Sequence, residues 1–150
     1  MSKEMVNHPK HYNNHPSGVE CIDVIRSMCF NIGNAFKYVY RRDDKENFVQ
    51  DLKKAIFYIN DEIEKRKKWK YTIMAKVLQP LFYLGRQDLY TSYVNRAELI
   101  NDICRWEDNF DVSHIYLLLH NADIEFMETS YLYEAREIIN HLLEQSNQNS

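Results

Sequence analysis

Residues 46–67 read ENFVQDLKKAIFYINDEIEKRK, and this stretch decides the fold. Its apolar residues recur every three or four positions, with one adjacent pair: Phe48, Leu52, Ala55, Ile56, Ile59 and Ile63. Spacing of this kind places the apolar side chains on one face of a helix. The stretch ends in basic residues, which are favourable at the negative pole of a helix dipole. We therefore predict a helix over Glu46–Lys67 that buries one face in a core.

The rest of the chain is also predicted to be helical, because only three glycines and three prolines are present to interrupt helices. Hydrophobic periodicity places further helices at about Ser17–Cys29, Asn34–Arg42, Tyr71–Leu84, Leu89–Asp108, Asp111–His120 and Ile124–Glu144. The first of them begins at a capping-box pattern, Ser17-x-x-Glu20. The expected fold class is all-α, a small multi-helix bundle with an irregular N-terminal segment packed on it.

Length and composition are those of a chain with a hydrophobic core. Hydrophobic residues make up 45% of the 150 residues and charged residues 27%, which are ordinary values for a folded domain. We divide the chain into a motif-bearing domain, 1–68, and a helical C-terminal extension of unknown role, 69–150. The three cysteines form no CxxC pair, so we expect reduced thiols. No run of about 18 apolar residues occurs, so no membrane span is expected.

Charge is distributed unevenly along the chain. Residues 1–70 hold 14 Lys and Arg against 10 Asp and Glu, whereas residues 71–150 hold 5 against 12. A basic N-terminal part suits an anionic ligand such as a phosphate. The excess is too small for a protein that wraps duplex nucleic acid, which needs many phosphate contacts. We therefore expect no specific duplex nucleic acid as a partner.

Four polar residues share one face of the predicted 34–42 helix, at spacings of three, four and seven: Asn34, Lys37, Tyr38 and Arg41. This row of donors contains no carboxylate, and it fits phosphate oxygens because Arg offers a fork and Lys a point charge. The plainer alternative is a solvated basic face, which is common. The next helix adds Asp51 and Lys54, three positions apart. They either pair on the surface, or Asp51 orients Lys54 or a basic residue of the preceding helix.

The N-terminal residues 7–12, NHPKHY, are unusually rich in functional side chains. A metal site built on His8 and His11 would need further ligands, and no cysteine or carboxylate completes an obvious set. We interpret the segment as a loop that offers these imidazoles and Lys10 to an anionic ligand, with Tyr12 available to stack on a base. The alternative is a structural loop that covers the helices.

Other motifs narrow the chemistry. Glu20 and Asp23, three positions apart, could hold Mg²⁺. A helix cap explains Glu20 better, and the first helical turn explains Asp23 equally well. The pattern G-x-x-x-x-G-K-[ST] is absent, which excludes an ordinary P-loop kinase, and G-x-S-x-G is absent as well. No certain cofactor is indicated, although Mg²⁺ could accompany a bound nucleotide.

Four blocks occur in a fixed order: VNHPKHY at 6–12, GVECIDVI at 18–25, GNAFKYVYR at 33–41 and DLKKAIFYI at 51–59. They resemble a widespread phage family that is catalogued as a domain of unknown function and described as phage nucleotide kinase-like or SaV-like. The resemblance covers about residues 5–66 and does not extend to the rest of the chain. It implies a phage-encoded protein that acts in the host cytoplasm.

The resemblance also implies phosphoryl transfer from a nucleoside triphosphate to a (deoxy)nucleoside monophosphate by a kinase without a P-loop. Catalysis would then rest on positioning and positive charge. From residue chemistry and motif position, the residues expected to act in catalysis are His8, His11, Lys37 and Arg41. The residues expected to bind ligand are Lys10, Tyr12, Asn34, Tyr38, Asp51 and Lys54. No metal ligand is assigned.

Other functions stay open. The Glu20-x-x-Asp23 pair is loosely similar to all-α nucleotide pyrophosphohydrolases, but Lys54 stands where their second carboxylate pair should lie. A non-catalytic nucleotide binder, sequestering a host defence signal or regulating nucleotide pools, would use the same basic residues. A third reading is a protein–protein module that docks a host protein through the acidic C-terminal half. Self-association into a homo-oligomer is expected in each case.

Overall fold

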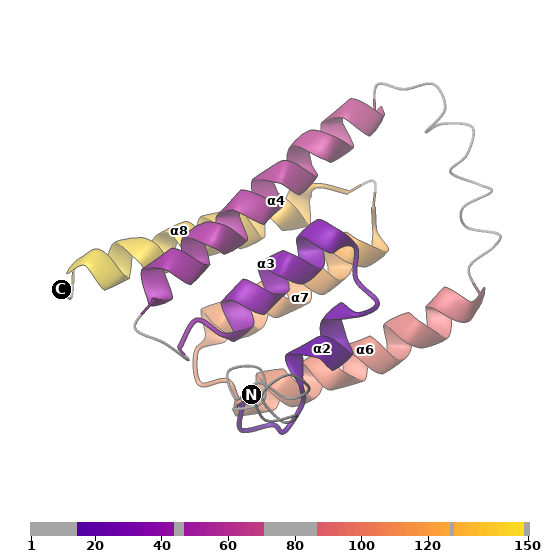
Figure 1. The fold of residues 1–150 in the computed structure, drawn as a ribbon, viewed down its shortest axis with the longest axis horizontal. Coiled ribbons are helices and arrows are strands. Elements are labelled where there is room, and N and C mark those ends of the chain that lie inside the picture. Colours follow the sequence, from indigo (N-terminus) through magenta and orange to yellow (C-terminus); the bar gives the residue numbers. More distant parts are fainter. Residues whose placement is uncertain (1–14, 44–46, 71–86, 127, 149–150) are drawn as a thin grey trace, which may run out of the picture.

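The structure, a computed structural model, describes residues 15–43, 47–70, 87–126 and 128–148. These residues form six helices and no strand: α2 (Cys21–Ile25), α3 (Phe30–Tyr40), α4 (Phe48–Lys70), α6 (Gln87–Trp106), α7 (Phe110–Ile124) and α8 (Ser130–Gln148) (Figure 1). The prediction of an all-α multi-helix bundle is therefore confirmed. The N-terminal segment that was expected to pack on the bundle comprises residues 1–16, of which 1–14 lie outside the described residues. The predicted helix at 71–84 lies outside them as well.

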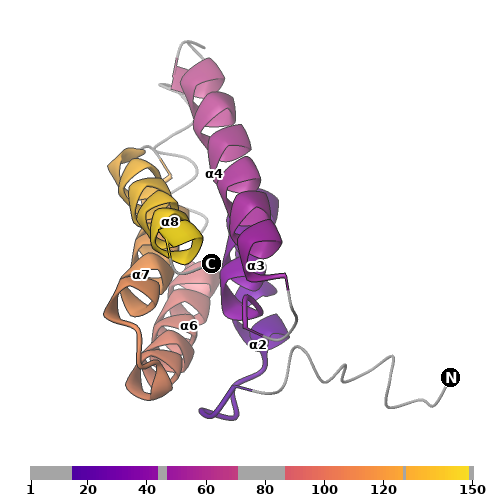
Figure 2. The same ribbon diagram turned by 90° about the vertical axis from the view of Figure 1, so that its left-hand side faces the viewer.

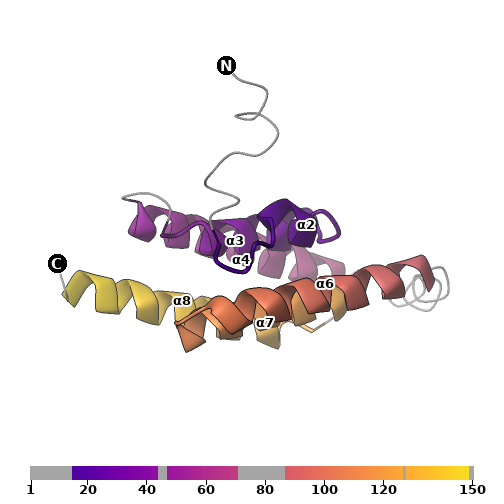
Figure 3. The ribbon, with the colours of Figure 1, turned by 90° about the horizontal axis from the view of Figure 1, so that it is seen from below.

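The helices form two layers. α2, α3 and α4 lie in one layer and α6, α7 and α8 in the other, as two perpendicular views show (Figures 2 and 3). Each helix of the first layer packs on one of the second, α2 on α6, α3 on α7 and α4 on α8. A single cluster of buried residues lies between the layers and includes Phe36, Leu52, Ile100, Ile115 and Leu132. Burial of this apolar surface is the main force that joins the two halves of the chain.

The helix predicted from residues 46–67 is confirmed as α4. Leu52, Ala55, Ile59 and Ile63 of its apolar stripe are buried. In the same layer, α3 begins at Phe30, four residues before the predicted start. The backbone N–H of Cys29, at the N-cap, donates to the Asp123 carboxylate (2.8 Å). An acceptor from a residue far away in the sequence thus satisfies a donor at the helix start, which no local pattern could reveal.

The prediction of a helix beginning at Ser17 is wrong, because α2 covers only Cys21–Ile25. Ser17 does not cap a helix. Its hydroxyl accepts a hydrogen bond from the backbone N–H two residues later (3.2 Å), as in a turn. Gly18 has a φ of 71°, a left-handed conformation that glycine adopts at little cost and that a right-handed helix cannot include. Glu20 is the N-cap residue instead, without a side-chain capping bond.

The C-terminal helices follow the predicted order with shifted ends. α6 lies within two residues of its predicted bounds. The predicted cap at Asp111 is wrong, because α7 begins at Phe110 and Asn109 is its N-cap residue. The Asn109 carboxamide oxygen accepts from the N–H groups two and three residues later (2.9 and 3.3 Å). α7 continues to Ile124, where the last helix was expected to start, so α8 begins later, at Ser130.

No helix in the described ranges combines the length and the apolar character that crossing a membrane requires.

Candidate functional site

Six of the predicted ligand-binding and catalytic residues contact one another. They lie on α3, at its C-cap and on α4, two helices that pack side by side (Figure 1). We call this set the cation cluster: Asn34, Lys37 and Tyr38 on α3, Arg41 at the C-cap of α3, and Asp51 and Lys54 on α4. The other predicted site residues, His8, Lys10, His11 and Tyr12, lie outside the described part of the chain.

Asp51 is the centre of the cation cluster. Its carboxylate is only 7% exposed. It accepts two hydrogen bonds from the Arg41 guanidinium, Nε to Oδ2 (2.8 Å) and Nη2 to Oδ1 (3.0 Å), and one from Lys54 Nζ (3.2 Å). Burial of the carboxyl acts to raise its pKa, but the hydrogen bonds and positive charges of Arg41 and Lys54 outweigh burial and lower the pKa. Asp51 therefore stays ionised and holds two cations in place across the two helices.

The Tyr38 ring is the meeting point of the cations. Lys37 Nζ lies 4.6 Å from the ring centroid, Arg41 Cζ 4.5 Å and Lys54 Nζ 5.3 Å. Attraction between each cation and the ring quadrupole helps to hold them near one another despite their like charge. Because Asp51 is the only carboxylate in the cation cluster, three cations against one anion leave a formal charge of about +2.

Lys37 carries charge that no carboxylate in the cluster neutralises by hydrogen bonding. Its Nζ donates to the neutral amide oxygen of Asn34 (2.6 Å), and the Asn34 amide nitrogen in turn donates to the Phe30 carbonyl (2.8 Å). Partial burial lowers the pKa of Lys37, and the charge of Arg41 lowers it further. An ammonium offers three N–H donors, of which Lys37 uses one here. A negative charge placed next to Lys37 would favour the charged ammonium.

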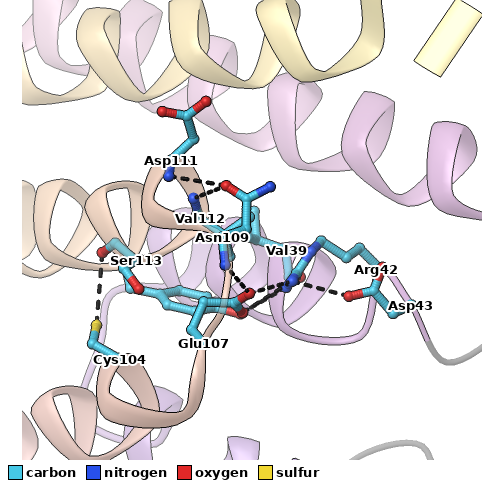
Figure 4. A network of polar contacts seen from close by, with 10 residues as sticks. Val39, Arg42, Asp43, Cys104, Glu107, Asn109, Asp111, Val112 and Ser113 are labelled. Atoms are coloured by element: carbon cyan, nitrogen blue, oxygen red, sulfur yellow. Dashed lines mark hydrogen bonds and ion pairs between the residues drawn. The ribbon is translucent and has the colours of Figure 1, made fainter. Parts of the chain in front are cut away.

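A different set of charged residues was missed by the sequence analysis. Arg42, the residue after Arg41, is only 8% exposed. Its Nη2 donates to both oxygens of Glu107 (each 2.9 Å) and pairs with Asp43 (2.9 Å), while its Nη1 donates to Val39 O (3.2 Å) and to the Tyr116 hydroxyl (3.3 Å). Figure 4 shows Arg42 between the end of α3 and the start of α7, next to the Asn109 cap. This network joins the two layers.

A cavity of about 430 Å³ lies beside this network. It is lined by His15, Pro16, Tyr40, Arg42, Asp43, Phe48, Trp106, Glu107, Asp108 and Asn109. The His15 ring lies 5.3 Å from the Tyr40 ring. The side chains of Arg42 and Glu107 are already paired with each other. These two lining side chains therefore belong to the network that joins the layers.

Two further buried arginines also act as ties. Arg66, one of the basic residues near the end of α4, is 2% exposed. Its Nε donates to Glu62 (2.9 Å), and its Nη atoms donate to backbone carbonyls of α7 and of the segment before α8. Arg96 pairs with Asp123 (2.8 Å) and donates through Nε to His120 Nδ1 (3.0 Å). Burial and the charge of Arg96 lower the pKa of His120 to about 4, so the imidazole stays neutral at physiological pH.

The remaining candidates of the sequence analysis show ordinary structural contacts. Asp23 pairs with Arg26 on the surface (2.6 Å). Within the described ranges, His, Cys, Asp and Glu side chains nowhere gather in a group of three or more that could hold a metal ion. Burial raises the pKa of Cys21 to about 12 and that of Cys29 to about 11, so neither thiol is an activated nucleophile.

Comparison with protein families gives a match in the N-terminal part of the chain. Residues 6–60 match the model of a family described as a protein of unknown function, DUF3310. The matched range, just over a third of the chain, includes α2, α3, the first half of α4 and every residue of the cation cluster, and it ends before Glu62 and Arg66. No curated protein and no solved structure matches the chain.

Proposed function

We propose that this protein binds nucleotides through their phosphate groups at the cation cluster. The observation that carries the proposal is the convergence of Lys37, Arg41 and Lys54 on one Tyr38 ring with a single carboxylate among them. The two hydrogen bonds to Asp51 fix the position of the Arg41 guanidinium before any ligand arrives, which lowers the entropic cost of binding. Lys37 and Lys54 have N–H donors left for phosphate oxygens, because Lys37 uses one and Lys54 two.

The reaction we propose is phosphoryl transfer from a nucleoside triphosphate to a (deoxy)nucleoside monophosphate, as the phage nucleotide kinase-like resemblance implies. A phosphate oxygen of the acceptor attacks the γ-phosphorus, and the bond from that phosphorus to the bridging oxygen breaks, leaving two diphosphates. The transferred group carries its charge on three equatorial oxygens, which a group of fixed cations stabilises. In this proposal Lys37 and Arg41 act on the transferred group, and His8 and His11 contact phosphate or relay a proton. Mg²⁺ would enter with the nucleotide.

The alternative is a protein that binds a nucleotide without turning it over, such as one that sequesters a host defence signal. One feature favours it: the only carboxylate of the cation cluster, Asp51, is engaged by Arg41 and Lys54 and has little capacity for a metal ion. Kinases of known type hold Mg²⁺ through carboxylates close to the phosphates. The two readings share the binding site and differ only in whether chemistry follows.

The test is product analysis by chromatography. Purified protein is mixed with each deoxynucleoside monophosphate and a triphosphate donor, with and without Mg²⁺. Diphosphate formation that disappears in a Lys37→Ala/Arg41→Ala variant supports the kinase. The matched control is Lys53→Ala, because Lys53 is an exposed lysine on α4 outside the cation cluster. Nucleotide binding by calorimetry without any product supports the sequestering protein, and the absence of binding overturns the proposal.

A further inference from the structure

Three aromatic side chains continue the cation cluster along the same pair of helices. Tyr58 of α4 stacks on Tyr38, with ring centroids 5.8 Å apart and an interplanar angle of 15°. Phe30 and Phe57 contact Tyr58 edge-on, at 6.0 and 5.3 Å. We call Phe30, Phe57 and Tyr58 the aromatic platform. It joins the cation cluster through the Tyr38 ring.

The two phenylalanines of the platform are exposed, whereas Tyr58 is partly buried against the core. Phe30 is 74% exposed and Phe57 64%, whereas Phe36 of α3 is fully buried in the core. A phenylalanine left in water forgoes roughly 1.5–3 kcal/mol of burial. Two such rings that meet at one tyrosine, from two different helices, form a local apolar surface beside a positively charged one.

The register of the helices explains why rings and cations lie in sequence along the surface. On α3, Phe30 and Asn34 precede Lys37 and Arg41, so the ring comes first and the cations later. α4 runs back along α3, and on it Lys54 precedes Tyr58. The rings of both helices therefore gather at one end and the cations at the other. Lys37 and Phe30 are seven residues apart, which is about 10 Å along a helix axis.

We propose that the aromatic platform stacks the base of a nucleotide whose phosphates lie on the cation cluster; this inference rests on the proposed function. Aromatic side chains next to cations are what proteins use to bind bases and phosphates together. Stacking of this kind tolerates every base, because each has a π-face. The platform would make the site selective for a nucleotide over an inorganic phosphate chain.

The size of the platform favours a small flat ligand over a second protein surface. An aromatic side chain buries about 150–250 Å², whereas a stable interface takes about 800 Å² from each partner. Phe30 and Phe57 together fall short of that area, and Lys37 and Lys54 next to them would repel the same residues of a second copy. A base needs only one ring face and its edge.

The test compares two probes of similar charge by calorimetry, a deoxynucleoside triphosphate and inorganic tripolyphosphate, which lacks the base. Wild-type protein is expected to bind the nucleotide more tightly. The Phe30→Ala/Phe57→Ala variant is expected to lose about 5- to 100-fold in nucleotide affinity and to bind tripolyphosphate as wild type does. Phe110→Ala is the matched control, because Phe110 is 80% exposed and lies on α7; it is expected to change neither affinity.

The outcomes separate the two proposals. Equal wild-type affinity for both probes would contradict base stacking on the aromatic platform but would be consistent with phosphate binding at the cation cluster. Loss of affinity for both probes in the double variant also overturns it, since the effect is then not on the base. A double variant that changes only its sedimentation, from dimer to monomer, identifies a second copy as the occupant. If wild type binds neither probe, the proposed function and the platform both fail.

Discussion

Arg41 and Arg42 are neighbours in the sequence and have opposite surroundings. Arg42 points between the two layers of helices, where its guanidinium pairs with the buried carboxylate of Glu107 and with the carboxylate of Asp43. Arg41 lies against α4, where Asp51 serves it and Lys54 at once, with Lys37 close by. The charge of one arginine is thus balanced by carboxylates, whereas the other arginine lies in a group with more cations than carboxylates.

We expect the two arrangements to have different roles, stability of the fold for the paired arginines and ligand binding for the cation cluster. The buried guanidiniums of Arg42, Arg66 and Arg96 are each paired with a carboxylate, and these pairs lie within or between the helix layers. Breaking a buried pair leaves an uncompensated charge, so these residues are needed for folding. The cation cluster has more positive than negative charge, and in the proposed function this excess binds an anion. The following predictions test this division.

The largest effect is expected on breaking a matched pair. Arg42→Ala leaves the buried Glu107 side chain without its partner, which should lower the free energy of unfolding by about 3–5 kcal/mol. The measurement is urea denaturation followed by circular dichroism. Arg26→Ala is the control, since Arg26 is 63% exposed in its pair with Asp23 and should cost less than about 1 kcal/mol. Equal losses in the two variants would show that the Arg42 pair is not a tie between the layers.

The second prediction concerns the protonation of His120, which would add a positive charge next to Arg96. His120 must be neutral to accept the hydrogen bond from Arg96, and its pKa is lowered from 6.5 to about 4. The unfolded chain therefore binds one more proton than the folded chain between these pH values. Stability should fall as the pH drops from 6.5 to 4, by a total of roughly 3 kcal/mol.

The control for this prediction is His120→Gln, whose amide oxygen can accept from Arg96 but does not titrate. Measuring the free energy of unfolding of both proteins across this pH range isolates the contribution of His120, because the buried carboxylates change the stability of both proteins alike. A wild-type curve parallel to that of the variant would contradict the assigned pKa shift.

The third prediction concerns the excess charge. Lys37→Ala removes a cation whose hydrogen bond goes to a neutral amide and whose pKa is already lowered. Stability should stay within about 0.5 kcal/mol of wild type. Affinity for tripolyphosphate should fall about tenfold or more, the worth of one charged hydrogen bond. A variant that is strongly destabilised, with its affinity retained, would place Lys37 among the folding residues.

Arg41 and Arg42 also illustrate which features of the structure could be predicted from the sequence and which could not. Periodicity fixed the long helix α4 and the face that carries Asn34, Lys37, Tyr38 and Arg41, because both follow from 3.6 residues per turn. It could not show that Arg42 is buried, since the partner Glu107 is 65 positions away.

The errors at helix ends have the same origin. α3 starts early because Asp123, from the other layer, satisfies the Cys29 N–H. Gly18 could be recognised as a turn residue, but its left-handed conformation was obscured by the capping-box pattern around it. The exposed rings of Phe30 and Phe57 were missed because hydrophobic residues on a helix are assumed to face the core.

The smallest effect is expected from the titration of Lys37. The pKa of Lys37 lies below 10.5, the ordinary value for lysine, so its ammonium loses its proton at a lower pH than an ordinary lysine does. A phosphate prefers the charged form, so wild-type affinity should fall as the pH rises through the alkaline range. Lys37→Arg keeps its charge throughout. The ratio of the two affinities for tripolyphosphate should change about two- to fivefold, as for one partly exposed ion pair.

The ratio matters more than either affinity, because tripolyphosphate itself gains charge with rising pH and does so equally in both measurements. A ratio that moves with pH locates the anion at Lys37. A constant ratio would leave Arg41 and Lys54 as the phosphate ligands and reduce Lys37 to a neighbour of the Tyr38 ring. The excess charge would then lie on α4 and the end of α3, and the nucleotide would have to approach the site from that side.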